Sequence, residues 1–156
     1  MGIKSFQGKR EVHKATENTQ FLVSDYMTKK LITFKPDDTL DDVIHLLIAH
    51  KISGGPVVND KNELIGIISE TDCIKHISES KYYNMPSDSG NNVAKKMITN
   101  VDTIEKDMNI FDAATKFINS KRRRFPVVEN GKLIGQISQK DVLKAALSFR
   151  GNTWKK

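Results

Sequence analysis

The sequence contains an internal duplication, and this duplication restricts the chain to folds built from two similar units. Residues 55–72 read GPVVNDKNELIGIISETD, and residues 125–141 read FPVVENGKLIGQISQKD. The prolines of the two PVV motifs lie 70 positions apart, whereas Gly66 and Gly135 lie 69 apart, so the second copy has lost one residue in a turn. A duplication of this size predicts two similar units packed as one body, with each site in one copy matched by a counterpart in the other.

The composition is that of an ordinary soluble globular protein. Hydrophobic residues make up 38% of the 156 residues and charged residues 28%. No apolar run approaches the roughly 20 residues of a membrane span, and the N-terminus lacks the apolar core of a signal peptide. The single cysteine, Cys73, excludes an intrachain disulfide and fits a reducing compartment. We therefore expect a cytoplasmic location, no membrane partner, and a thiol that is buried or incidental rather than nucleophilic.

The charge balance favours anionic partners without choosing among them. The formal net charge is +6, and much of the excess lies near the two termini and in the run Lys121–Arg124. Nucleotides, nucleic acids and acidic proteins all fit such a balance. Solubility alone would also account for it.

Repeat 1 predicts a β-α-β-β-α unit. Residues 31–34 read as a strand that stops at a proline, and a helix with apolar residues at helical spacing follows over 40–50. Two short strands, 56–58 and 63–69, are joined by a turn rich in Asn and Asp, and a second helix covers 71–78. The residues expected to face the core from the two helices are Leu40, Val43, Ile44, Leu47, Ile48, Ile74 and Ile77.

Repeat 2 predicts the same order of elements. A strand at 102–104, a helix, strands at 125–128 and 133–138, and a helix at 140–147 follow one another. The residues expected inward from its first helix are Ile110, Ala113, Ala114, Phe117 and Ile118. The predicted division of the chain is a polar N-terminal tail (1–20), repeat 1 (21–78), a linker (79–92), repeat 2 (93–148) and a basic C-terminal tail (149–156).

Both repeats end a strand and begin a helix with the motif G-x-x-S-x-x-D. Ser69 and Asp72 carry it in repeat 1, and Ser138 and Asp141 in repeat 2. A serine N-cap with an acidic residue in the first turn stabilises a helix start, which is its structural role. The same groups suit a nucleotide, because a carboxylate can accept both ribose hydroxyls and a helix N-terminus favours phosphate.

Taken together, these motifs resemble the cystathionine-β-synthase (CBS) domain. The order h-x-T-h, P-V-V and G-x-x-S-x-x-D within a β-α-β-β-α repeat is typical of that family, and it covers roughly residues 22–148. Two copies resemble a tandem CBS pair, or Bateman module, of the stand-alone bacterial type. The resemblance implies a mixed α and β fold (α/β in the broad sense, α+β in detail) of two repeats related by pseudo-twofold symmetry. It also implies two clefts between the repeats that hold AMP, ADP, ATP, S-adenosylmethionine or related adenosyl ligands.

The resemblance also implies which residues contact the ligand. The family's ribose-binding aspartate falls on Asp72 and Asp141, and the residue that flanks the adenine falls on Thr33 and Thr103. The complete set for repeat 1 is Thr33, Phe34, Ser53, Gly54, Gly55, Pro56, Ser69 and Asp72. The complete set for repeat 2 is Thr103, Ile104, Arg123, Arg124, Phe125, Pro126, Ser138 and Asp141.

The two sets differ most just before the P-V-V strand. Repeat 2 has Arg123 and Arg124 there, and guanidinium groups bind phosphate through paired hydrogen bonds. Repeat 1 has Ser53 and Gly54, which carry no charge. We therefore favour repeat 2 for an anionic nucleotide and expect repeat 1 to be adenosine-like, weak or vacant. The structural alternative is an exposed basic helix end with favourable dipole contacts.

No catalytic motif and no metal-ligand spacing is found in the sequence. We expect a regulatory sensor without enzymatic activity and without a required cofactor. Its regulatory ligand would be an adenine nucleotide or S-adenosylmethionine, and by resemblance it would be a homodimer that modulates a separate partner protein. The alternative is a nucleic-acid-binding or scaffold protein that uses its basic surface and has vestigial clefts. The low aromatic content of 7% argues against single-strand binding.

Overall fold

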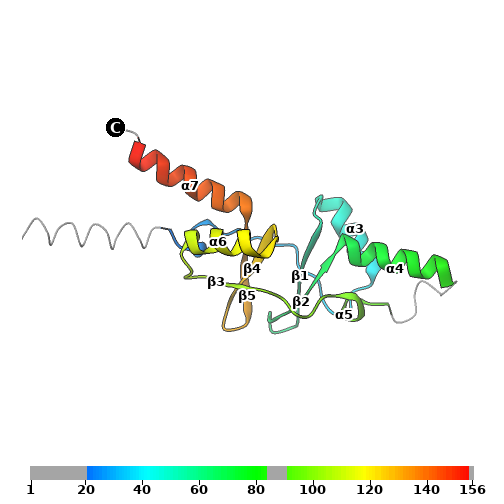
Figure 1. Cartoon of the computed structure of the whole chain (residues 1–156). Coiled ribbons are helices and arrows are strands. Elements are labelled where there is room, and N and C mark those ends of the chain that lie inside the picture. Colours follow the sequence, from blue (N-terminus) through cyan, green and yellow to red (C-terminus); the bar gives the residue numbers. More distant parts are fainter. Residues whose placement is uncertain (1–20, 84–90, 155–156) are drawn as a thin grey trace, which may run out of the picture. The chain divides into compact units, whose positions relative to one another are not determined.

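A computed structural model describes residues 21–83 and 91–154 of the chain. The predicted N-terminal tail and the middle of the predicted linker lie outside the described residues. The predicted mixed α and β fold with two copies of one repeat is confirmed (Figure 1). The chain divides into two compact units, which we call the repeat-1 unit (30–102 and 128–133) and the repeat-2 unit (up to 29, 103–127 and from 134).

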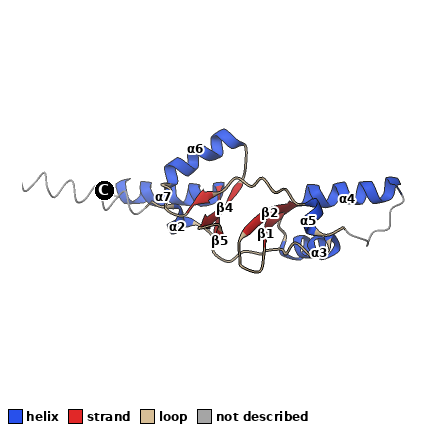
Figure 2. Cartoon of the chain, turned by 90° about the horizontal axis from the view of Figure 1, so that it is seen from below, coloured by secondary structure: helices blue, strands red, loops and turns tan. Residues whose placement is uncertain are grey.

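The repeat-1 unit places helices beside an antiparallel hairpin (Figure 2). Its elements are α3 (Leu40–His50), β1 (Gly54–Val58), β2 (Leu64–Ser69), α4 (Glu70–Tyr83) and α5 (Val93–Lys96). Helix α3 begins after Thr39, whose hydroxyl accepts a hydrogen bond from the N–H of Asp42 (3.1 Å). Thr39 therefore acts as the N-cap of α3.

The repeat-2 unit has the corresponding elements and one additional short strand, but its short helix comes first in the chain and not last. In chain order the elements are α2 (Val23–Tyr26), β3 (Ile104–Glu105), α6 (Ile110–Ser120), β4 (Arg124–Glu129), β5 (Lys132–Ser138) and α7 (Gln139–Trp154). The three strands form one sheet in the order β3-β4-β5. The turn of the β4–β5 hairpin, residues 128–133, belongs to the repeat-1 unit.

The segment that precedes each repeat packs in the unit of the other repeat. In the repeat-2 unit, the N–H of Val23 at the start of α2 donates to the carbonyl of Met108 (2.9 Å). In the repeat-1 unit, the N–H of Val93 at the start of α5 donates to the carbonyl of Asp38 (3.0 Å). Val23 and Met108 of one contact correspond in the repeats to Val93 and Asp38 of the other. The two repeats have therefore exchanged their short helices, because α2 packs in the repeat-2 unit and α5 packs in the repeat-1 unit.

A methionine next to each exchanged helix packs on a glycine of the adjoining strand. A Cβ atom on Gly135 would lie 2.7 Å from Met27 Sδ, and one on Gly66 would lie 2.5 Å from Met97 Sδ. No side chain fits at either position without displacing the methionine. This close approach explains why both repeats have glycine in the middle of the second hairpin strand.

Four helix-facing predictions are wrong. Ile74 and Ile77 of α4 and Ile118 of α6 are exposed, with 63%, 53% and 78% of their surface accessible. On α4 the residues one position before each isoleucine, Cys73 and His76, are buried instead. Because adjacent residues on a helix point about 100° apart, an apolar neighbour of an inward residue lies on the flank. Ile48, also expected inward, is exposed for the same reason.

Some predicted boundaries also differ from the structure. Helix α4 continues to Tyr83 and α7 to Trp154, beyond the predicted ends at 78 and 147. Contacts hold both extensions, because Glu79 pairs with Lys96 and the ring of Phe149 packs on the buried Phe21. The predicted strand at 31–34 is reduced to a single bridge from Phe34 to Val57. No helix in the described part of the chain is both long and apolar enough to cross a membrane.

Candidate functional site

The duplicated Ser-x-x-Asp motif forms the same hydrogen-bonded helix start in both units. In the repeat-2 unit, the N–H of Ser138 donates to Asp141 Oδ2 (2.9 Å), and the N–H of Asp141 donates to Ser138 Oγ (3.2 Å). In the repeat-1 unit, the N–H and Oγ–H of Ser69 both donate to Asp72 Oδ2 (2.9 Å each). The predicted capping role is therefore confirmed.

Each aspartate uses only one of its two oxygens in this way. Asp72 and Asp141 are 8% and 7% exposed, yet among the described residues no hydrogen bond reaches the Oδ1 atom of either. In the described residues, Ser120 Oγ is the side-chain atom that is both fully buried and without a hydrogen-bond partner. The two Oδ1 atoms have no partner and are not in that class, so neither is fully enclosed. Each unit therefore presents a fixed carboxylate oxygen that can accept hydrogen bonds from a ligand.

The basic segment of the repeat-2 unit is held against the start of α7. The N–H of Gln139 donates to the carbonyl of Arg123 (3.0 Å), and Gln139 Nε2 donates to the carbonyl of Arg122 (3.1 Å). Because Gln139 directly follows Ser138, these bonds bring the arginine segment to the Ser-x-x-Asp motif. Arg123 is exposed and Arg124 is partly buried.

The repeat-1 unit has the same backbone contact but no room for a charged side chain. The N–H of Glu70 donates to the carbonyl of Ser53 (2.9 Å), which matches the bond from Gln139. Gly54 pairs with Ser69 across the hairpin, and a Cβ on Gly54 would lie 2.7 Å from the carbonyl oxygen of Ile68. This unit cannot place an arginine where the other has Arg124 unless the backbone shifts.

Several predicted site residues are in the core and can contact a ligand only through their backbone. Phe34, Ile104 and Phe125 are buried, and so are Pro56 and Pro126. The strand start is nevertheless close to the P-V-V segment, because the N–H of Phe34 donates to the carbonyl of Pro56 (3.0 Å). The structure thus brings the predicted segments of each unit together, with Thr33 exposed and Thr103 partly buried.

The sequence analysis missed one residue, Lys116 on α6. Its Nζ donates to the carbonyl of Thr103 (2.7 Å) and lies 5.1 Å from the centroid of the Phe125 ring. Two of the predicted site segments of the repeat-2 unit are thereby joined by one ammonium group. The counterpart in repeat 1 is Leu46, so comparing the repeats position by position would have drawn attention to it.

The thiol is confirmed as buried. Cys73 directly follows Asp72 on α4 and is buried. Burial is the main cause that raises the pKa of its thiol, and the negative charges of Asp72 and Glu70 raise it further. A thiol held in its neutral form is a poor nucleophile.

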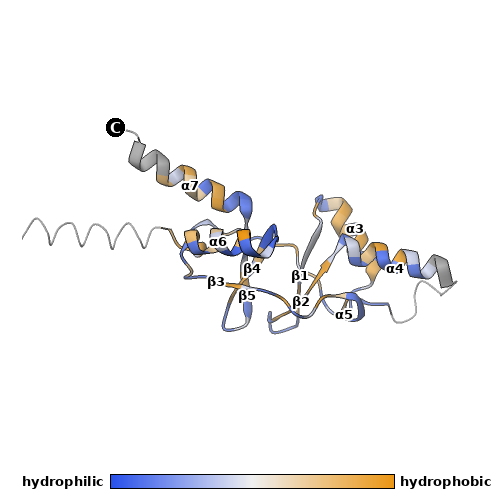
Figure 3. Cartoon of the chain, viewed as in Figure 1, coloured by the Kyte–Doolittle hydropathy of each residue, from blue (hydrophilic) through white to orange (hydrophobic). Residues whose placement is uncertain are grey.

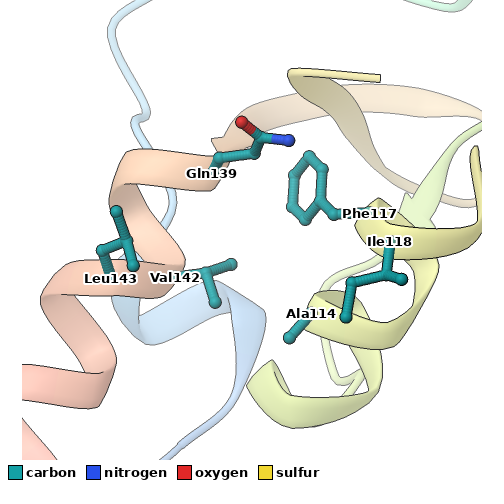
Figure 4. Close-up of a pocket in the computed structure, with 6 residues that line it drawn as sticks. All are labelled: Ala114, Phe117, Ile118, Gln139, Val142 and Leu143. Atoms are coloured by element: carbon teal, nitrogen blue, oxygen red, sulfur yellow. The ribbon is translucent and has the colours of Figure 1, made fainter. Parts of the chain in front are cut away.

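Each unit also has an apolar groove between its two longer helices. In the repeat-2 unit the groove runs between α6 and α7 and is lined by Ala114, Phe117, Ile118, Gln139, Val142 and Leu143 (Figure 4). The corresponding groove of the repeat-1 unit is lined by Ile44, Leu47, Ile48, Glu70, Cys73, Ile74 and Ile77. Figure 3 shows hydrophobic bands along the helices that border them. The grooves contain neither the aspartates nor the arginines, so they are separate from the candidate site.

Comparison with known proteins gives a consistent result. The CBS domain model matches twice, at residues 23–79 and 92–148. The chloroplastic CBS domain-containing protein CBSX1 of Arabidopsis thaliana is 31% identical over 155 residues, which cover 83% of this chain and 66% of that protein. The match spans about two thirds of that relative's length.

Two solved structures are also similar. CBSX2 of Arabidopsis thaliana in complex with AMP is 32% identical with a TM-score of 0.73, and the match covers 83% of this chain and 98% of that one. The CBS domain pair of MJ0100, solved with 5′-methylthioadenosine and S-adenosyl-L-methionine, is 24% identical with a TM-score of 0.66. That match covers 82% of this chain and 97% of the other, and it supports the fold alone.

Proposed function

The chain belongs to the CBS domain family as a tandem pair, and from this membership we propose that it is a non-catalytic regulatory sensor of adenosyl nucleotides. The observation that carries the proposal is the buried aspartate of each unit, fixed through Oδ2 and open at Oδ1. Such a carboxylate suits the two hydroxyls of a ribose. The similarity to CBSX2, solved with AMP, supports an adenine nucleotide as the ligand class.

The repeat-2 unit is the stronger site in this proposal. Asp141 accepts the ribose hydroxyls, and Arg123 and Arg124 bind the phosphate from the segment fixed by Gln139. Arginine favours phosphate because its planar guanidinium donates paired hydrogen bonds. AMP, ADP and ATP all satisfy these groups, and S-adenosylmethionine lacks the phosphate that the arginines would bind.

The repeat-1 unit takes a ligand with less negative charge, or binds the same ligand more weakly. Asp72 is available as Asp141 is, but Ser53 and Gly54 supply no cation, and Gly54 has no room for one. Its site therefore depends on the ribose and the base.

Regulation would require a second protein surface, and the helical grooves provide it. We assign the grooves to contact with a second copy of this chain, because each unit presents one with exposed aliphatic side chains at matching positions. A ligand that favours one arrangement of the helices would then change the affinity for a separate regulated protein. Size-exclusion chromatography with light scattering should show a dimer that Ile118→Asp converts to a monomer.

Thermal unfolding with AMP, ADP, ATP, S-adenosylmethionine and a short DNA duplex tests the proposal. At about 100 times its dissociation constant, a specific ligand adds about 2.7 kcal/mol of stability and raises the Tm by several degrees. Asp141→Ala should weaken AMP binding by roughly tenfold or more, whereas the matched variant Asp72→Ala should leave the tighter site unchanged. Stabilisation by DNA alone, fading as salt rises, would instead favour the nucleic-acid-binding alternative, for which the exposed run at 121–123 is the supporting feature.

A further inference from the structure

The backbone carbonyl of the threonine at the start of each repeat, Thr33 or Thr103, has different hydrogen bonding in the two units. In the repeat-2 unit the carbonyl of Thr103 accepts a 2.7 Å hydrogen bond from Lys116 Nζ. In the repeat-1 unit the equivalent carbonyl, that of Thr33, accepts no hydrogen bond from any residue that the structure describes. Leu46, which replaces Lys116, has no polar atom to offer it.

The ammonium of Lys116 is held in place and is not a freely moving surface charge. It is fixed at one side by the Thr103 carbonyl and lies over the ring of Phe125, which is itself buried against Phe117 with ring centroids 4.8 Å apart. A cation over an aromatic face is attracted to it. Lys116 therefore keeps its positive charge beside the Thr103 carbonyl.

Purine bases differ in what they offer to such a carbonyl. Adenine carries an amino group, a donor, at its sixth position, whereas hypoxanthine and guanine carry a carbonyl acceptor there. A free backbone carbonyl accepts from the amino group and disfavours the carbonyl. A carbonyl already bonded to an ammonium loses much of this preference.

We propose that Lys116 determines base selectivity, so that the repeat-2 unit binds purine nucleotides by their phosphate with little preference for adenine, whereas the repeat-1 unit selects adenine through the free Thr33 carbonyl. This inference rests on the proposed function, with the base placed beside Thr33 and Thr103 as the resemblance to CBS domains implies. One unit then responds to total purine nucleotide, and the other to the adenosyl group itself.

AMP and IMP form a matched ligand pair for the test, since they differ only in the base, where a carbonyl and an adjacent ring N–H replace the amino group and the unprotonated ring nitrogen of adenine. Titration calorimetry on the full chain reads each site separately: Asp72→Ala leaves the repeat-2 site, and Asp141→Ala leaves the repeat-1 site. At the repeat-2 site we expect dissociation constants for AMP and IMP within about threefold of each other. At the repeat-1 site we expect AMP to bind about tenfold or more tightly than IMP, the effect of one hydrogen bond worth about 1.4 kcal/mol.

Lys116→Met in the Asp72→Ala protein should raise the preference for AMP to about tenfold, and Lys116→Arg, which keeps a cationic donor, should leave the two ligands nearly equal. Leu46→Met in the Asp141→Ala protein is the matched control and should not alter the ratio. Because both ligands are measured on the same variant, the ratio does not depend on a change in stability. Binding with a ratio that Lys116→Met leaves unchanged overturns the inference and leaves the proposed function intact. Absence of binding by either nucleotide at either site overturns both.

Discussion

The two units have the same backbone arrangement, but the aromatic side chain that fills one shared core position comes from a different strand in each. Where repeat 1 has the large Phe34 against the side-chain-free Gly55, repeat 2 has the smaller Ile104 against the large Phe125. A Cβ on Gly55 would lie 2.9 Å from Phe34 Cε2, so the two aromatic rings could not both be present in one unit. The aromatic ring at this place therefore comes from the strand start in one unit and from the hairpin strand in the other, and close packing leaves room for only one.

A second difference lies where the last helix of each unit meets the exchanged short helix. In the repeat-2 unit, four aromatic rings come together: Phe21, Tyr26, Phe111 and Phe149. In the repeat-1 unit the equivalent positions are polar, and Lys96 Nζ bonds Glu79 at 2.8 Å instead. The same contact is made by apolar burial in one unit and by an exposed ion pair in the other. The first mechanism is generally stronger.

The largest expected effect comes from the ring that only the repeat-2 unit has. Phe125→Ala should lower the free energy of unfolding by about 3 to 5 kcal/mol, because Phe125 is fully buried and the change leaves a cavity beside Phe117. Urea unfolding followed by circular dichroism measures the loss. The control is Phe111→Ala, whose ring is largely exposed and should cost less. A loss below about 1 kcal/mol for Phe125→Ala would show that the core collapses into the cavity.

The size exchange can be tested by copying one unit into the other. Gly55→Phe should lower the free energy of unfolding by about 1 to 3 kcal/mol through collision with Phe34. Combining it with Phe34→Ile reproduces the pair found in repeat 2 and should recover part of that loss. A double-mutant cycle measures the coupling between the two changes. Strict additivity of the two single effects would contradict the exchange.

The aromatic cluster should contribute less than the core ring. Phe149 lies 5.4 Å from Phe21 and 5.9 Å from Phe111 between ring centroids, but it is 42% exposed. Phe149→Ala should therefore cost about 1 to 2 kcal/mol in the free energy of unfolding. Its counterpart Ser80 gives the control, since Ser80→Ala removes no ring contact and should leave the unfolding midpoint unchanged. Equal effects at both positions would remove this difference between the units.

The smallest effect is expected from the ion pair and should depend on pH. The hydrogen bond and charge of Lys96 lower the pKa of Glu79, so the pair stabilises the folded chain above the unfolded-state pKa of a glutamate. That contribution is lost as the pH falls through the lowered folded-state pKa. Glu79→Gln should lower the Tm slightly at neutral pH and not at all once Glu79 is protonated. A difference in Tm that persists in acid or in concentrated salt would exclude the ion pair as its cause.

Much of the fold follows from local patterns in the sequence. The hairpin turns and the Ser-x-x-Asp helix starts depend on residues within four positions of one another, and the structure has them as predicted. The helix faces were less predictable. Ile74 and Cys73 are both apolar neighbours on α4, and only packing decides which of them is buried.

The distinguishing features of the site depend on contacts that a single sequence does not reveal. Nothing in the residue type of Gly54 shows that the carbonyl of Ile68 fills the space of its side chain. Lys116 reaches the carbonyl of Thr103 thirteen positions earlier, across from one element to another. The charged residues Arg123 and Arg124 were predictable because their difference from repeat 1 is written in the residue types themselves.

The reciprocal exchange of α2 and α5 has a consequence for synthesis on the ribosome. The repeat-2 unit contains both residues up to 29 and residues from 134 onward, and the repeat-1 unit needs 128–133. Neither unit has all its parts until translation has passed the second hairpin, so the emerging N-terminal half must wait with Phe21 and Val23 unburied. A chain cut off within repeat 2 therefore carries α2 without the residues from 134 onward that complete its docking position.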